Sequence, residues 1–206
     1  MSALETVILL LIVGSAVWLF MIRPNRKQHV RLNHLPEQFI VFDLETTGLD
    51  PSRHQIIEFG AIKVNRDSTN HQTFQTLVKP TRKVSTKITE ITGITNEMLA
   101  DGDTIEEAYA AFMEFVGDLR LVSFNADFDM SFLNAAAAAH GRVVRNPVSC
   151  ALKMARRARP GRKSYKRKAL ARDGGLDTST IHRALADARM AISVYTAAAS
   201  RLQTLD

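Results

Sequence analysis

The side chains best suited to chemistry in this chain are four carboxylates and one histidine, found in three short stretches. They are Asp43 and Glu45 in FDLETTGLD, Asp129 in SFNADFDMSFL, and His182 and Asp187 in IHRALADA. Carboxylate oxygens are the ligands that hard divalent cations prefer. An imidazole, with an unperturbed pKa of about 6.5, exchanges a proton with its surroundings near neutral pH. These residue types therefore suit a metal-assisted reaction, provided that the fold brings them together.

Asp43 and Glu45 are one residue apart in a stretch that is predicted to be a buried strand. Side chains alternate between the two faces of a strand, so both acids point one way while Phe42 and Leu44 point the other way. Two anions about 7 Å apart repel each other, and burying them is costly unless a positive group neutralises them. Bound divalent cations are the usual solution. The alternative is a strand end whose acids face water or pair with basic side chains.

The other two stretches place their polar residues where helices are predicted to begin. Asn125 and Asp129 are four residues apart, and acids at a helix N-terminus are also favoured simply by the helix dipole. His182 and Asp187 flank the start of the last predicted helix, where the ordinary alternative is a surface ion pair between Arg183 and Asp187. His182 and Asp187 lie about 140° apart on an ideal helix, so they converge only if the histidine lies at the helix entrance.

Hydrophobic patterning and capping residues divide the chain into strands and helices. Strands are predicted over 39–46, 56–65, 73–79 and 121–124, with a short extended stretch at 147–149. The second and third strands are predicted to form an antiparallel hairpin. Helices are predicted from Asp103 or Thr104, over 126–140, within the basic segment 153–172, and over about 182–202. This order predicts an α/β or α+β sheet with helices on its faces.

The N-terminal segment differs in composition from the rest of the chain. Residues 6–22 contain no charge, and the basic residues that follow at once are Arg23, Arg26, Lys27 and Arg31. At about 1.5 Å per residue, this run reaches the short end of a bilayer crossing. A cleaved signal peptide carries positive charge before its apolar run, whereas Glu5 precedes this one. We therefore expect a retained transmembrane helix with the C-terminal domain in the cytoplasm, and a cleaved signal or a packing helix is the alternative.

Charge is unevenly distributed along the chain. The net charge is +6, and residues 153–172 contain ten basic residues and no acid. Such a segment is expected to meet the phosphate backbone of a nucleic acid, although charge runs are often only solvated helix faces. Anionic lipid headgroups are the rival partner because the chain is predicted to be tethered. The single cysteine, Cys150, excludes an intrachain disulfide, and we assign it no role.

Taken together, the motifs resemble the DEDDh group of 3′-to-5′ exonucleases, whose proofreading members include the epsilon subunit of bacterial replicative DNA polymerase. The resemblance covers about residues 37–204. The motifs that carry it are DLETTGL from Asp43, ITGIT from Ile91, NADFDMSFL from Asn125 and HRALADA from His182. They occur in the order and spacing of the family. The resemblance implies a ribonuclease H-like α/β fold, with a five-stranded mixed sheet flanked by helices.

The resemblance also implies the roles of the acids and the histidine. The residues that look like ligands of two Mg²⁺ or Mn²⁺ ions are Asp43, Glu45, Asp129 and Asp187. His182 looks like the general base that accepts the proton of the attacking water. The implied reaction is hydrolysis of the terminal phosphodiester with release of a nucleoside 5′-monophosphate, because paired ions stabilise both the attacking and the leaving oxygen of an in-line displacement at phosphorus.

Further residues are implied to contact the terminal nucleotide. The resemblance gives this role to the backbone around Thr46 and Thr47. It implies that Leu49 and Ile94 contact the nucleobase and that Asn125 helps to order the site. The alternative is that Leu49 and Ile94 are ordinary core residues and that Thr46 serves only a turn. The sequence departs from many relatives immediately before the asparagine, where Phe124 replaces a histidine. A phenylalanine cannot donate a hydrogen bond but can stack or pack.

The basic segment lies between the second and third motifs, where relatives often have a similar but less basic run. We expect it to guide the nucleic-acid backbone toward the acidic site, through Arg162, Lys163, Lys166 and Arg167. Tyr165 offers a possible stacking surface for a base.

These inferences predict two parts, an N-terminal transmembrane anchor with a basic linker at 1–36 and an exonuclease domain at 37–206. The expected protein is a metal-dependent 3′-to-5′ exonuclease at the inner (cytoplasmic) membrane, with single-stranded DNA as the preferred substrate. The alternatives are an RNA-trimming or oligoribonuclease-type enzyme, since only contacts to the 2′-hydroxyl separate the two sugars, and a non-cutting nucleic-acid-binding or polymerase-binding module. The sequence does not identify a polymerase partner.

Overall fold

The computed structural model describes residues 35–173 and 183–204. The chain divides into two units, residues 1–31 and residues 32–206, and every described element belongs to the second unit. The predicted membrane segment at 6–22 lies outside the described residues. Within the described part of the chain, no helix is both long and apolar enough to cross a bilayer.

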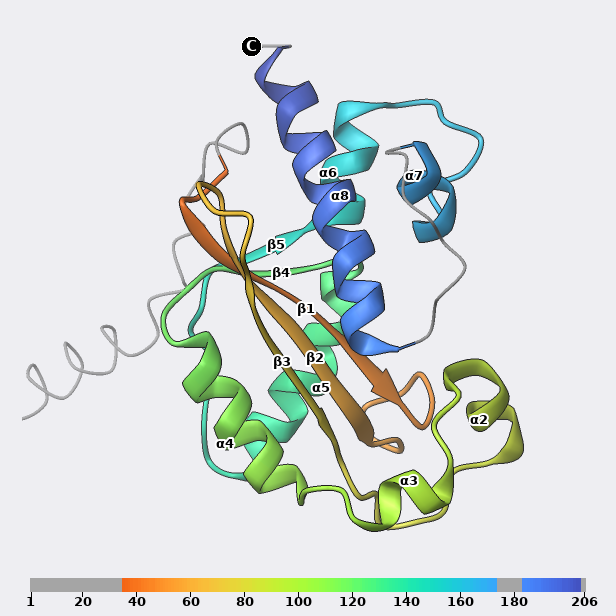
Figure 1. The fold of residues 1–206 in the computed structure, drawn as a ribbon. Coiled ribbons are helices and arrows are strands. Elements are labelled where there is room, and N and C mark those ends of the chain that lie inside the picture. Colours follow the sequence, from red (N-terminus) through yellow and green to blue (C-terminus); the bar gives the residue numbers. More distant parts are fainter. Residues whose placement is uncertain (1–34, 174–182, 205–206) are drawn as a thin grey trace, which may run out of the picture. The chain divides into compact units, whose positions relative to one another are not determined.

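A five-stranded mixed sheet forms the centre of the described unit (Figure 1). Its strands are β1 (Gln38–Thr46), β2 (Ile56–Asn65), β3 (Gln72–Leu77), β4 (Leu121–Ser123) and β5 (Val148–Cys150). The spatial order is β3-β2-β1-β4-β5. The β3–β2 and β2–β1 pairs are antiparallel, and the β1–β4 and β4–β5 pairs are parallel. The predicted α/β architecture with a five-stranded mixed sheet is confirmed, including the hairpin of β2 and β3.

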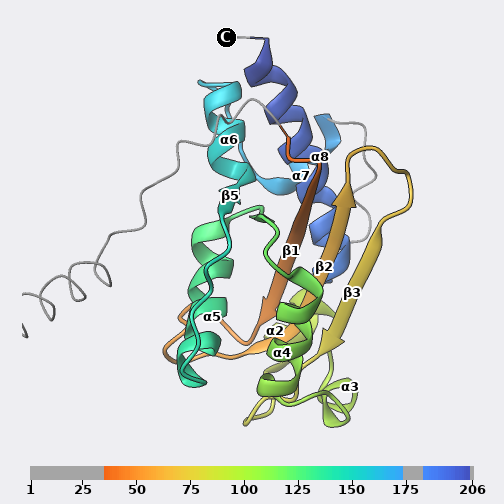
Figure 2. The same ribbon diagram turned by 90° about the vertical axis from the view of Figure 1, so that its left-hand side faces the viewer.

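Strand β1 lies at the centre of the sheet and is buried on both faces. Phe39 and Val41 pack in a core cluster with α6 (Ala151–Ala158), α7 (Arg167–Asp173) and α8 (Ala184–Gln203). Phe42 and Leu44 pack in a second cluster with α4 (Ile105–Val116) and α5 (Ala126–Ala139). The two helical layers therefore cover opposite faces of the sheet (Figure 2). The strand alternation expected from the sequence is present, so Asp43 and Glu45 share the face that α8 covers.

Helix boundaries follow the capping residues of the sequence. Of the two caps that the sequence allows, Asp103 and Thr104, it is Thr104 that caps α4, and it forms a capping box with Glu107. Helix α5 ends at Ala139, and His140 is the C-terminal capping residue. Helix α8 begins at Ala184, and Arg183 is its N-cap residue.

Two short helices were not predicted from the sequence. They are α2 (Thr86–Thr92) and α3 (Asn96–Ala100). Their N-terminal caps are Ser85 and Thr95, whose side chains accept hydrogen bonds from backbone N–H groups of the first turn. Helices of one or two turns are too short to show a hydrophobic period, which is why patterning missed them. The basic segment is likewise two helices, α6 and α7, because Pro160 and Gly161 interrupt it between them.

Candidate active site

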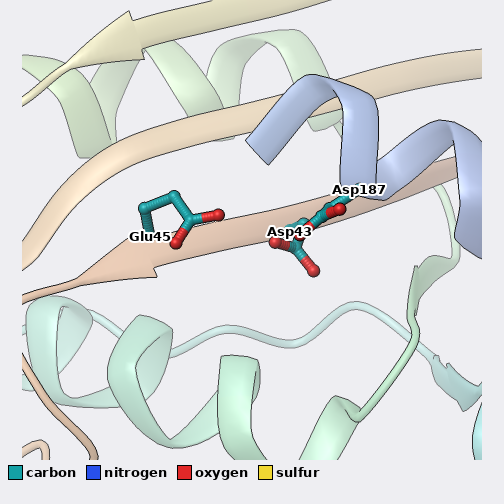
Figure 3. A group of neighbouring side chains, drawn as sticks. All are labelled: Asp43, Glu45 and Asp187. Atoms are coloured by element: carbon teal, nitrogen blue, oxygen red, sulfur yellow. The ribbon is translucent and has the colours of Figure 1, made fainter. Parts of the chain in front are cut away.

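Three buried carboxylates meet above the centre of the sheet. Asp43 and Glu45 lie on β1, and Asp187 lies in the first turn of α8 (Figure 3). Their nearest ligand oxygens all lie within 4.8 Å of one another. Residues more than 140 positions apart in the sequence therefore form one compact acidic group, which a divalent cation with oxygen ligands fits.

Close packing of α8 against β2 brings Asp187 to β1. Gly60 pairs with Asp43 across the β1–β2 ladder, and the start of α8 rests directly on this glycine. A Cβ atom at residue 60 would lie 2.3 Å from the backbone nitrogen of Leu185 and 2.4 Å from the carbonyl carbon of Ala184. A side chain there would push α8 away from the sheet. The sequence analysis missed this glycine, because a lone Gly within a strand pattern does not say which element approaches it.

A second buried acid fixes the entry to α8. Glu58 on β2 is fully buried and accepts hydrogen bonds from the Arg183 guanidinium, at 2.7 Å from Nη2, and from the backbone N–H of Ala184, at 2.9 Å. Gln75 also donates to it, at 2.8 Å. Arg183 therefore pairs with Glu58. The surface ion pair between Arg183 and Asp187, which was the ordinary alternative for this stretch, is not formed. Neither Glu58 nor its role was identified from the sequence.

Asp129 is the fourth of the predicted acids, and it lies on α5, in the helical layer on the other face of the sheet from α8. It is buried in the first turn of α5, where it accepts hydrogen bonds from the Ser123 hydroxyl and from the backbone N–H of Leu44, the latter at 3.2 Å. The contact with β1 brings it close enough for its charge to raise the pKa of Asp43. The structure therefore brings together all four carboxylates that the sequence proposed as ligands.

Burial of these acids makes ionisation costly without a cation. Desolvation raises the pKa of Asp43 well above its ordinary range, and the charges of Asp129, Asp187 and Glu45 raise it further. Desolvation, followed by the charge of Asp187, raises the pKa of Glu45 to about 8. Desolvation raises the pKa of Asp129 to about 6, although the hydrogen bond from Ser123 opposes this. Mutual repulsion between buried anions is the electrostatic signature of a site that binds a positive ligand.

Arg167 of α7 supplies positive charge within the acidic group. Its Nη1 lies 2.6 Å from Oδ1 of Asp43, and its Nη2 donates to Oδ2 of Asp187. The side chain is 22% exposed. Its guanidinium carbon also lies 5.6 Å from the centre of the Phe124 ring. The sequence assigned Arg167 to backbone phosphates, and the structure instead places it between two of the predicted metal ligands.

A cavity of about 380 Å³ opens beside the acids. Besides Asp43, Glu45, Asp129 and Arg167, its lining includes Thr46, Leu49, Ile91, Phe124, Asn125 and Phe128. Its volume lies within the range of small-molecule sites. Leu49 is 82% exposed at the cavity, so the core alternative does not hold for this residue. Asn125 is also exposed there, and Thr46 is buried with its hydroxyl donating to the Gly48 carbonyl at 2.6 Å.

Two predicted nucleotide contacts are located away from this cavity. Ile94 is fully buried in a separate core cluster with Ile57, Val84 and Leu99, which corresponds to the core alternative. The backbone N–H of Thr47 donates to the Gln55 carbonyl, and its hydroxyl accepts from the Gln55 N–H, so both groups are used within the turn. Ile91, in the same ITGIT motif as Ile94, lines the cavity instead and was missed by the sequence analysis.

The remaining basic residues divide into paired and exposed groups. Arg162 forms an ion pair with Asp173 at 2.5 Å, whereas Lys163 and Lys166 are exposed. Tyr165 is half-buried against the α6–α8 cluster, and its hydroxyl donates to the Arg159 carbonyl at 2.5 Å. Of the four residues expected at the nucleic-acid backbone, two are therefore free at the surface of the described unit. The predicted base, His182, lies outside the described residues.

Comparison with known proteins agrees with this geometry. Residues 40–195 match the exonuclease family of the RNase T type. The chain is 38% identical over 167 residues to DNA polymerase III subunit epsilon of Aquifex aeolicus, a match that covers 81% of this chain and 82% of that protein. It is also 38% identical over 153 residues to the PolC-type DNA polymerase III of Clostridium perfringens, covering 74% of this chain but only 10% of that much longer protein.

Solved structures of exonucleases have a similar fold. Exonuclease X in complex with 5′ overhanging duplex DNA is 28% identical, with a TM-score of 0.61, and the match covers 78% of this chain and 90% of that one. E. coli exonuclease I in complex with a dT13 oligonucleotide has a TM-score of 0.71 at 21% identity, covering 82% of this chain and 42% of that one, and it shows the shared fold. The chain belongs to the exonuclease family, in its DEDDh group.

Proposed function

We propose that this protein is a metal-dependent 3′-to-5′ exonuclease that releases nucleoside 5′-monophosphates from the 3′ end of DNA. The observation that carries the proposal is the convergence of buried Asp43, Glu45 and Asp187, with oxygens within 4.8 Å, beside a cavity that Asp129 and Leu49 also line. A non-cutting module would have no physical need for this costly group of anions.

Two Mg²⁺ or Mn²⁺ ions fit the donor set. The ligands would be Asp43, Glu45, Asp129 and Asp187, which offer the oxygen atoms that hard cations require. Arg167, which already bridges Asp43 and Asp187, marks a position where positive charge is stabilised. When bound, the ions supply Lewis acidity at the phosphate and stabilise charge on the attacking and leaving oxygens.

Residues of this chain perform the remaining tasks. The cavity holds the terminal nucleotide, with exposed Leu49 and Ile91 offering apolar surface to its base. Asn125, exposed at the start of α5, offers an amide for polar contacts. We assign the general base to His182, which accepts the proton of the attacking water. Arg183, the next residue in the chain, is held by Glu58.

Relatives support the choice of DNA. The epsilon subunit is named as part of a DNA polymerase, and exonuclease X was solved in complex with 5′ overhanging duplex DNA. Exonuclease I was solved with single-stranded DNA. We take a single-stranded or unpaired 3′ end of DNA as the preferred substrate. RNA trimming is the alternative, because the acids act on the phosphate, which both polymers share.

The test uses the full chain with DNA and RNA oligonucleotides of matched sequence, each labelled at its 5′ end. One set has a free 3′ end and the other a blocked 3′ end, and reactions contain Mg²⁺, Mn²⁺ or EDTA. We expect stepwise shortening of DNA with a free 3′ end, dependent on metal. Asp43→Asn and Asp187→Asn should lower the rate by at least about a thousandfold. Asp127→Asn, which alters an exposed acid of α5, is the matched control and should cut normally.

Other outcomes would contradict the proposal in different ways. Release of the labelled 5′-terminal nucleotide, at equal rates from the 3′-free and 3′-blocked substrates, would reverse the direction. Shortening of RNA alone would establish the RNA-trimming alternative. Binding of both polymers by the wild-type protein, with neither shortened at any metal concentration, would establish a binding module.

We also propose that residues 6–22 anchor the enzyme in the inner (cytoplasmic) membrane, with the catalytic domain in the cytoplasm. The support is an uncharged run followed at once by a basic cluster. The full chain, expressed in bacteria, should remain in the membrane fraction after a carbonate wash, and protease added outside spheroplasts should leave the exonuclease domain intact. Leu10→Arg with Val13→Arg should release it, whereas Val143→Arg with Val148→Arg, at exposed positions of the domain, should not. Recovery of the wild-type chain in the soluble fraction would contradict the anchor.

A further inference from the structure

Arg167 occupies an unusual position for a residue of an exposed basic segment. Its guanidinium bridges Asp43 on β1 and Asp187 on α8, and the three side chains are respectively 22%, 9% and 0% exposed. Planar guanidinium groups bind carboxylates and phosphates with equal geometric suitability, because both present two oxygens. The same side chain can therefore serve either kind of partner.

The acids that Arg167 contacts are also the proposed metal ligands. The charge of Arg167 lowers the pKa of Asp43, against the larger upward effect of burial. A divalent ion bound by Asp43 and Asp187 would carry twice that charge at the same oxygens. The guanidinium and the ion repel each other and compete for the negative charge of the same two carboxylates, so binding of the ion favours departure of the guanidinium.

Phe124 gives the guanidinium a second contact that does not depend on the acids. The guanidinium carbon lies 5.6 Å from the centre of the Phe124 ring, within cation–π range. Phe124 and Arg167 both line the cavity of about 380 Å³. If the guanidinium leaves the carboxylates, it can therefore keep its contact with the Phe124 ring at the cavity wall. This contact also gives a role to the phenylalanine at a position where many relatives have histidine.

The backbone of α7 is fixed, so only the side chain needs to move. Leu170 and Ala171 are buried in the core cluster with α8. Asp173, at the end of α7, pairs with Arg162 at 2.5 Å and with Arg159 at 3.8 Å. These contacts hold Arg167 at the edge of the site in either arrangement.

We propose that Arg167 is a substrate-positioning residue with two alternative partners. Without metal it neutralises Asp43 and Asp187. With divalent ions on the acids it turns into the cavity, remains against Phe124, and binds a phosphate oxygen of the terminal nucleotide. This inference rests on the proposed function, and it predicts opposite effects of one substitution on two ligands: tighter binding of metal and weaker binding of nucleotide.

The experiment measures both ligands by isothermal titration calorimetry on the full chain. The probes are Mn²⁺ alone, and then thymidine 5′-monophosphate in saturating Mn²⁺. Arg167→Met removes the charge and keeps an unbranched stem, and Lys168→Met is the matched control because it removes an exposed positive charge from the same helix. Arg167→Met should tighten Mn²⁺ binding by about threefold or more and weaken the nucleotide by about tenfold or more. Lys168→Met should change neither.

Several results would overturn the inference. Unchanged or weaker Mn²⁺ binding by Arg167→Met would show that the guanidinium does not compete with metal, and unchanged nucleotide binding would show that it does not hold phosphate. If Arg167→Met does not fold, Arg167→Lys keeps a charge without the bidentate fork and should shift both affinities in the same directions, by smaller factors. A wild-type chain that binds neither probe would refute the proposed function itself, whereas normal cutting with unchanged affinities in Arg167→Met would refute only this inference.

Discussion

At the scale of single residues, the site is defined by acids that are held where their charges are unfavourable. Asp129 receives hydrogen bonds from Ser123 and from the backbone of Leu44, which fix its orientation. Asp43 forms an ion pair with Arg167. Burial nevertheless raises the pKa values of Asp43, Glu45 and Asp129. The buried acids therefore bear an electrostatic cost that a bound cation, as proposed above, would relieve.

That cost predicts how stability depends on pH without metal. The pKa of Glu45 is raised from 4.5 to about 8, so the folded state holds this proton more strongly than the unfolded state. The stability that it contributes is complete below pH 4.5 and is lost as the pH rises through about 8. In EDTA, the free energy of unfolding from urea titrations should therefore fall between about pH 4.5 and about pH 8.

Glu45→Gln tests the assignment of this pH dependence. The amide cannot ionise, so the fall in stability with pH should become shallower than in the wild-type protein. Glu114→Gln, at an exposed position of α4, is the matched control and should leave the slope unchanged. An equal slope in Glu45→Gln would show that other groups produce the dependence.

At the scale of elements, the position of α8 relative to the sheet decides whether the site exists. Two features of β2 set this position, namely Gly60, which allows close contact, and Glu58, which holds Arg183 and the N–H of Ala184. Asp187 lies on the first turn after these contacts. A small shift of this helix end would remove one ligand from the acidic group.

Removal of the buried Glu58 carboxylate should loosen the packing of the N-terminal end of α8. Glu58→Ala leaves Arg183 without its partner and the N–H of Ala184 without an acceptor, so we expect a loss of about 3 kcal/mol in the free energy of unfolding. Mn²⁺ affinity should fall as well, because Asp187 is displaced. Urea denaturation and calorimetry measure the two effects. Glu106→Ala, which removes an exposed acid of α4, should change stability by less than about 0.5 kcal/mol, and a similar change in both variants would contradict this role of Glu58.

Adding one methyl group at residue 60 should have a related effect. Gly60→Ala places a Cβ within 2.3 Å of the Leu185 nitrogen, so α8 must move outward. We expect a loss of about 1–3 kcal/mol in stability, as for other overpacked cores, together with weaker Mn²⁺ binding. Because no charge is altered, weakened metal binding here would result from geometry alone. Full retention of stability and metal affinity would show that α8 tolerates the shift.

At the scale of the whole described unit, the clustered acids and the exposed lysines of the basic segment lie in different places. The acids are buried at the centre of the sheet, whereas Lys163 and Lys166 are exposed between α6 and α7. This distribution suits the proposed substrate, a polymer whose backbone would meet the basic surface while its terminal phosphate reaches the buried acids.

The basic surface therefore predicts the salt dependence of nucleic-acid binding. Lys163→Glu with Lys166→Glu should weaken binding of single-stranded DNA and flatten the slope of log affinity against log salt by about one unit or more. Arg53→Glu with Arg82→Glu, at exposed positions of the β1–β2 and β3–α2 connections, is the matched control and should leave the slope nearly unchanged. An unchanged slope in the first variant, together with lost binding to anionic liposomes, would assign the surface to the membrane instead.

The sequence by itself determined the strands of the sheet, the cap of α4 and the identity of the four acids. These are local properties, because each depends on only a few neighbouring residues. Examples are the alternation along β1, the Thr104–Glu107 capping box and the composition of each motif. It did not reveal α2 and α3, which are too short to show a period.

Only the tertiary structure decided which side chains meet. It placed Ile94 in the core and Ile91 at the cavity, and it brought Arg167 from a basic run into the acids. It also disclosed Gly60 and Glu58 as the supports of Asp187. Contacts between residues more than a hundred positions apart depend on how helices pack on a sheet, and no short stretch of sequence encodes that packing.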